Sequence, residues 1–107
     1  MKINLSFVPP GGGRIEYNLV MDMPEIPRQG DYISITRPGQ TGAETFIVKR
    51  AWWNLEVDES KPKGTVKEIQ VECEFAVSKL ASEDHRRTCE DYHARTGRLL
   101  EFDVSMQ

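Results

Sequence analysis

The stretch that decides the fold is Glu68-Ile69-Gln70-Val71-Glu72-Cys73-Glu74-Phe75-Ala76-Val77. Apolar side chains occupy every second position of this stretch, and most of the positions between them are charged or polar. Because side chains alternate between the two faces of a strand, this order predicts a β-strand with one buried face and one face in water. We therefore expect Cys73 in the core and Glu72 in solvent.

The same alternation recurs towards the N-terminus. Residues 2–7 and 14–21 alternate in this way, and the segment 9–13 between them contains two prolines and three glycines. Such a segment reverses the chain, so the two runs predict an N-terminal hairpin. A proline-containing connector at 22–31 leads into a third predicted strand at 32–36.

Residues 45–57 form a long run of β-branched and aromatic residues whose alternation changes phase. Phe46 and Val48 share one phase, whereas the opposite phase is shared by Ala51, Trp53, Leu55 and Val57. A β-bulge around residues 50–52 produces such a change, so we expect the strand to bend there. Adjacent side chains of a strand point to opposite faces, so we expect at most one of Trp52 and Trp53 to be exposed unless the bulge rotates both.

One helix is expected after the fifth strand. Ser82 is a favourable N-cap, and Gly97 suits the left-handed position that follows a last helical turn. Residues 100–106 then alternate again, which predicts a sixth strand. The order β-β-β-β-β-α-β favours a mainly β fold: an antiparallel curled sheet or small barrel with one C-terminal helix. A flat antiparallel sheet with the helix on one face, an α+β arrangement, is the alternative, because alternation does not measure curvature.

Composition limits the classes of function. A chain of 107 residues has the size of one domain, so we expect residues 1–107 to form a single β-rich unit. Fourteen basic and seventeen acidic residues give a net charge of −3, which excludes a generally cationic polyanion binder. No run approaches the roughly 18 apolar residues of a membrane helix, and no signal peptide is recognisable. We therefore expect a cytoplasmic protein with free cysteines and no membrane partner.

Four residues suggest a zinc site. His85, Cys89 and His93 recur at intervals of four along the predicted helix, and Cys73 faces the predicted core. Eight helical residues rise about 12 Å, so the two histidines reach one ion only at the limit of their side chains. In the simpler interpretation, Cys89 packs as a small apolar residue beside Tyr92, and the two histidines lie at the edge of the buried face of the helix. We expect no cofactor and keep the zinc site as an alternative.

Basic and aromatic residues gather around the third and fourth predicted strands. They are Arg37, Lys49, Arg50, Trp52 and Trp53. Basic groups interleaved with aromatic rings are typical of proteins that bind single-stranded nucleic acid. The acidic residues of the fifth strand would repel phosphate or pair with these basic residues across strands. Binding of nucleic acid is therefore an alternative to the function that we favour.

No pattern of catalytic residues is recognisable. The loop at 9–14 lacks the Lys-Ser/Thr pair of a phosphate-binding loop, and no serine stands in a nucleophile-elbow pattern. We therefore expect a non-enzymatic binding or assembly module. Its exposed strand edge or an exposed tryptophan would mediate docking to a protein partner or self-association, for example as a homodimer.

Overall fold

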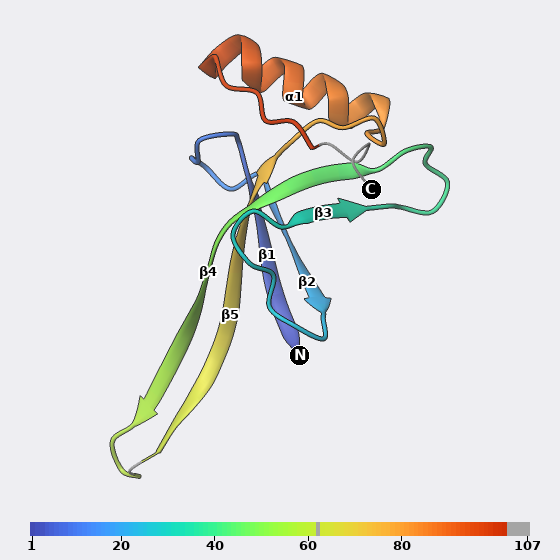
Figure 1. Ribbon diagram of the computed structural model, residues 1–107. Coiled ribbons are helices and arrows are strands. Elements are labelled where there is room, and N and C mark those ends of the chain that lie inside the picture. The colour runs from blue at the N-terminus through green and yellow to red at the C-terminus, as the bar shows by residue number, and fades with distance from the viewer. Residues whose placement is uncertain (62, 103–107) are drawn as a thin grey trace.

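The computed structural model describes residues 1–61 and 63–102 of the chain. Within these residues lie the strands β1 (Lys2–Val8), β2 (Tyr17–Asp22), β3 (Tyr32–Ile35), β4 (Glu44–Asp58) and β5 (Lys63–Phe75), and the helix α1 (Glu83–Thr96). The strands form one sheet in the order β2-β1-β5-β4-β3. The sheet is a strongly curled half-barrel with the helix across one end (Figure 1), which confirms the expected mainly β, curled architecture.

The pairing of β1 with β5 corrects the prediction that all strands are antiparallel. Leu5 pairs with Val71 and Phe7 with Cys73 in parallel register, whereas the other three strand pairs are antiparallel. A short turn forces its two strands to be antiparallel, but β1 and β5 are separated along the chain by three other strands. No turn therefore sets their relative direction, and the sheet is mixed.

The strand predicted at residues 100–106 is reduced to an isolated bridge in the part of the chain that the structure describes. The Val77 N–H donates to the Leu100 carbonyl at 2.9 Å, and the Phe102 N–H donates to the Val77 carbonyl at 2.7 Å. Phe102 is buried, and its ring lies against Tyr32 with 4.2 Å between the centroids. Because β5 ends at Phe75, the segment meets only Val77 beyond it. Residues 103–106 of the predicted strand lie outside the described residues.

The concave face of the sheet carries the core. Its side chains come from alternate positions of β1, β4 and β5 and from α1: Ile3, Leu5, Phe7, Phe46, Val48, Ile69, Val71, Cys73, Phe75, Cys89 and Tyr92. Cys73 is fully buried, as the alternation predicts. The helix packs against this face through His85, which stacks on Phe75 at 5.3 Å, and through Tyr92, which meets the same ring edge-on at 5.2 Å.

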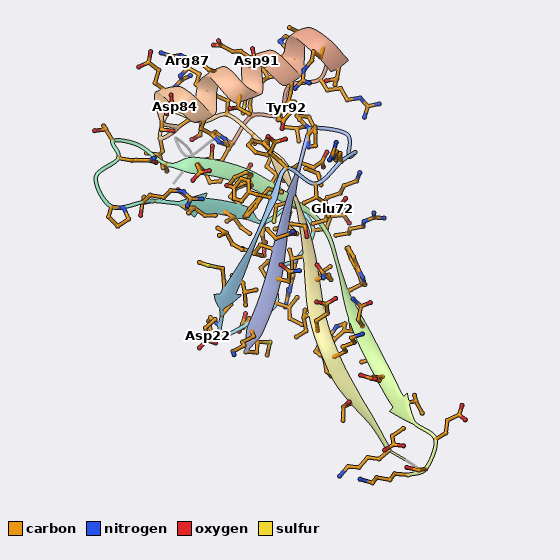
Figure 2. The ribbon with its side chains drawn as sticks, turned by 180° about the vertical axis from the view of Figure 1, so that it is seen from behind. Asp22, Glu72, Asp84, Arg87, Asp91 and Tyr92 are labelled. Carbon is orange, nitrogen blue, oxygen red and sulfur yellow. The ribbon has the colours of Figure 1, made fainter. Side chains whose placement is uncertain are left out.

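Helix α1 begins and ends where the capping residues predict. The Ser82 Oγ accepts a hydrogen bond from the His85 N–H at 3.2 Å, and Gly97 has a φ of 74°. Figure 2 shows Tyr92 on the side of the helix that faces the sheet and Arg87 on the opposite side. Within residues 1–61 and 63–102, no helix is long and apolar enough to cross a bilayer.

Strand β4 contains the bulge that the change of phase predicts. Val48 pairs with Cys73 and Arg50 with Glu72, so Lys49 is the extra residue. One extra residue reverses the alternation, which brings the apolar positions after the bulge onto the face that Val48 occupies. The two phases of the sequence therefore form one continuous apolar face. A second irregularity follows between Asn54 and Leu55.

The loop between β3 and β4 fastens the start of the helix to the sheet. The Ala43 N–H donates to the Leu80 carbonyl and the Ser82 N–H donates to the Ala43 carbonyl, both at 2.8 Å. Gly42 precedes this contact with a φ of +88°, and a Cβ placed on it would lie 2.7 Å from the Ser82 Cα. This position therefore needs glycine both for its backbone conformation and for space.

We expect Gly42→Ala to destabilise the fold more than Gly39→Ala. Gly39 also has a positive φ, of +79°, but a Cβ there meets nothing within 4 Å. Both variants carry about 1 kcal/mol of backbone strain. The clash with Ser82 should lower the free energy of unfolding of Gly42→Ala by about 1–3 kcal/mol more, as measured by urea denaturation. Equal losses in the two variants would show that the loop does not press on the helix start.

Candidate functional site

Strands β4 and β5 run far beyond the rest of the sheet (Figure 1). Strand β3 pairs with β4 only between Glu44 and Ile47, and β1 pairs with β5 only from Gln70 onwards. Residues 51–58 and 63–69, called the arm below, therefore form a two-stranded ribbon that has no third strand beside it within the described residues. The molecule measures 52 × 28 × 27 Å along its principal axes, and the arm accounts for the long one.

One face of the arm is apolar and continues the core. In the register of β4 and β5, Ala51 pairs with Val71 and Trp53 with Ile69, so the arm begins beside buried core residues. Further along the same face, four large apolar side chains are each more than half exposed: Trp53 (53%), Leu55 (66%), Val57 (70%) and Val66 (51%). The core of the half-barrel thus extends into an apolar strip that the described residues leave uncovered.

Both tryptophans are exposed, so the expectation of at most one exposed tryptophan is wrong. Trp53 lies on the apolar face, and Trp52, with 39% of its surface exposed, lies on the opposite face beside Gln70. The two rings do point to opposite faces, as adjacent strand residues must. The expectation failed because the sheet and the helix cover neither face of the arm.

Glu72 is buried, which corrects the prediction of a uniformly wet convex face. The residue is 8% exposed, and its Oε2 accepts from the Arg50 Nε at 2.5 Å. Arg50 also lies over the Trp52 ring, 5.4 Å from the ring centroid, and so covers the carboxylate. Figure 2 shows Glu72 where the arm leaves the sheet. Glu72 and Cys73 still lie on opposite faces, so the assignment of the concave face holds.

The predicted basic residues are divided between different parts of the molecule. The Lys49 Nζ lies 3.4 Å from the Gly11 carbonyl, in the loop between β1 and β2. Arg50 is paired with Glu72 on the convex face, whereas Arg37 belongs to a different cluster near the helix. Of the three basic residues, Arg50 is the one that contacts a tryptophan.

Arg37 is part of a polar cluster that joins the β2 side of the half-barrel to the β3–β4 side. The Tyr17 hydroxyl donates to the Glu44 Oε1 at 2.6 Å, and the Arg37 Nε donates to the Glu44 Oε2. Together with His85 these side chains line a cavity of about 290 Å³. No signal in the sequence predicts this cluster, because its members are far apart along the chain and no local spacing relates them.

The charges in this cluster suit structural pairing better than proton transfer. Burial alone would raise the pKa of Glu44, but the hydrogen bonds from Arg37 and Tyr17 outweigh it and lower the pKa. Burial and the contact with Glu44 raise the pKa of Tyr17 well above its ordinary value. At neutral pH, Tyr17 is therefore a protonated donor and Glu44 an ionised acceptor, which is a stable arrangement rather than a reactive one.

The candidate zinc ligands are placed mostly in the core. Cys73, Cys89 and His85 are buried, whereas His93 is exposed. Burial is the main cause that raises the pKa of Cys73 to about 12 and that of Cys89 to about 11, so both are neutral thiols at pH 7. No group of three or more His, Cys, Asp or Glu side chains within the described part of the chain is placed to hold a metal ion.

His85 has backbone partners for one of its ring nitrogens. Its Nε2 lies 2.8 Å from the Ala76 carbonyl and 3.2 Å from the Thr45 backbone nitrogen. The ring therefore connects the helix to the ends of β4 and β5. His85 is buried, so it lies within the packed face of the helix and not at its edge as expected.

We expect Tyr17→Phe to lower the free energy of unfolding at pH 7 by about 1–2 kcal/mol, because a hydrogen bond to a carboxylate is lost. The pKa of Glu44 in the folded state lies below its ordinary value of 4.5. The stabilisation is therefore present above pH 4.5 and is lost as the pH falls through the folded-state pKa. Urea denaturation at pH 7 and at about pH 3 should show the difference between the variant and the wild type shrinking at the lower pH.

Tyr32→Phe is the matched control for this measurement. It removes the same hydroxyl from a half-exposed ring whose oxygen has no hydrogen-bond partner within the described residues. Its effect should be close to zero at both pH values. A Tyr17→Phe effect that does not change with pH would mean that the hydroxyl does not stabilise the Glu44 carboxylate.

Comparison of the chain with protein-family models, with curated proteins and with solved structures gave no match in any of the three.

Proposed function

We propose that the chain is a non-enzymatic assembly module that self-associates through the apolar face of its arm. The observation that carries this proposal is the continuity of the core with four exposed apolar side chains on a projecting two-stranded ribbon. In a core, such side chains are covered by a second layer. We infer that a second copy of the chain supplies this layer.

The arm has the physical character of an element that requires support. An isolated two-stranded hairpin is at best marginally stable in water. Its four large side chains together expose on the order of 400 Å² of apolar surface, the size at which exposed patches of monomeric proteins are commonly functional. Two arms packed face to face would bury about 800 Å² of apolar surface. About 60% of the area of an interface is apolar, so the total area that two arms would bury, apolar and polar together, reaches the range of a standard specific interface.

The charges of the arm and its base do not oppose a second copy as the partner. The base carries Lys49, Arg50, Glu68 and Glu72, and the tip carries Glu56, Asp58, Lys63 and Lys67, so each end has two basic and two acidic residues. Most of them lie on the face opposite the apolar one, so contact through the apolar face brings no net like charge together. An antiparallel pair of arms related by a two-fold axis places the two half-barrels at opposite ends of the dimer, and this is the orientation that we propose.

We expect the wild-type chain to form a dimer at micromolar concentration, measured by sedimentation equilibrium. Leu55→Ser combined with Val57→Ser should raise the dissociation constant by at least about tenfold, because two anchors of the apolar face are lost. The matched control is Asn54→Ser combined with Thr65→Ser on the opposite face of the arm, which should leave the dissociation constant unchanged. A wild-type chain that stays monomeric at about 100 μM would contradict the proposal.

Crosslinking tests the antiparallel orientation. In that orientation, position 57 of one copy lies near position 51 of the other, which places the two-fold axis at position 54, next to position 55. Sheets packed face to face lie about 10 Å apart, too far for a disulfide, so the test uses a thiol-specific crosslinker of about that length. A mixture of Ala51→Cys and Val57→Cys should give a mixed crosslinked dimer, while Leu55→Cys should link to itself. Cys73 and Cys89 are buried and protonated, so they should not compete. Efficient self-linkage of Val57→Cys would indicate parallel arms instead.

A further inference from the structure

A pocket of about 290 Å³ lies on the convex face of the sheet, where the arm begins. Side chains of four neighbouring strands line it: Asn4 and Ser6 from β1, Asn18 from β2, Gln70 from β5, and Trp52 and Asn54 from β4. We propose that this pocket binds a single neutral sugar residue. Its C–H face would stack on Trp52, and its hydroxyl groups would bond to the amide side chains.

The amide side chains are held in position by the sheet and by one another. Asn4 pairs with Gln70 and Gln70 with Trp52 across adjacent strands, so the three lie in one row. The Asn4 Nδ2 donates to the Gln70 Oε1 at 3.1 Å, and the Ser6 Oγ donates to the Asn18 Oδ1 at 2.7 Å. A polar group that is fixed before binding loses little freedom when a ligand arrives.

This arrangement leaves some hydrogen-bonding groups of the pocket lining without a partner within the described residues. The Asn4 Oδ1 is buried and accepts no hydrogen bond within the described residues. The amide nitrogens of Asn18 and Gln70 donate none to that part of the chain, because their bonds are made through the oxygens. A sugar hydroxyl both donates and accepts, so adjacent hydroxyls of one ring could satisfy an unpaired acceptor and unpaired donors together. A purely apolar ligand would leave the Asn4 oxygen unsatisfied.

Trp52 supplies an apolar surface beside these polar groups. Its ring is 39% exposed and is held by the Arg50 guanidinium 5.4 Å from its centroid. Small-molecule sites typically combine an aromatic ring with a small number of polar groups that fix the orientation of the ligand. The charges around the pocket favour a neutral ligand, because Arg50 is already paired with Glu72 and the Glu68 carboxylate accepts from Asn54 at 3.1 Å. A nucleotide phosphate would meet these carboxylates.

The test is a titration of the ¹⁵N-labelled full chain, followed by NMR, with the methyl glycosides of glucose, galactose, mannose and N-acetylglucosamine, and with adenosine as a nucleobase probe. At least one glycoside should shift the indole N–H of Trp52 and the side-chain amides of Asn18 and Gln70, with a millimolar dissociation constant. Trp52→Ala should weaken this binding at least tenfold. The matched control is Trp53→Ala, which removes a tryptophan from the opposite face and should leave the binding unchanged.

Three results would overturn the proposal. The first is the absence of shifts with every glycoside up to about 100 mM. The second is shifts with adenosine alone, which would identify a nucleobase site. The third is binding that survives in Trp52→Ala, which would place the ligand elsewhere; Asn18→Ala, at the rim of the pocket, provides a second variant should Trp52→Ala fail to fold. Because the pocket lies on the face opposite the apolar strip, none of these results bears on self-association.

Discussion

Strand β5 is the element on which the rest of the structure depends. From Gln70 to Glu74 it is paired on both sides, with β1 in parallel and with β4 in antiparallel orientation. Its side chains alternate with a period of two, so each residue is committed to one face of the sheet. A slip of one residue would move Cys73 and Phe75 out of the core and bring Glu72 and Glu74 in. This register fixes which residues of β1 and β4 pair with β5, and it fixes where the helix packs.

The arm continues the same alternation of apolar and polar side chains, but its apolar face is left exposed by the described residues. Beyond Ile69 the apolar positions continue, but neither the helix nor a third strand reaches them. The bulge at Lys49 is what joins the two parts, because it rotates the distal half of β4 so that its apolar residues extend the concave face. One strand therefore contributes at its start to the core and at its end to an apolar surface that the described residues leave exposed.

The two faces of the arm have opposite chemistry. The apolar face suits contact with a second apolar surface, whereas the face with Trp52 and the amide side chains is polar and fixed by hydrogen bonds. At the other end of the half-barrel, Tyr17 and Glu44 hold the curled sheet together across its opening, beside the helix. This part-buried polar contact thus lies near the helix, and the large exposed apolar side chains of the arm lie at the other end.

The sequence by itself determined the first five strands, the helix with its caps at Ser82 and Gly97, the bulge in β4 and the burial of Cys73, because each depends on local periodicity or capping chemistry. It could not determine the parallel pairing of β1 with β5, the cover over Glu72 or the exposure of both tryptophans. Each of these depends on which segments meet in space. The strand predicted to begin at Glu68 in fact begins at Lys63, because the hairpin continues as far as its backbone groups pair with β4. Only the tertiary structure shows that, among the described residues, no other element lies beside this part of the hairpin.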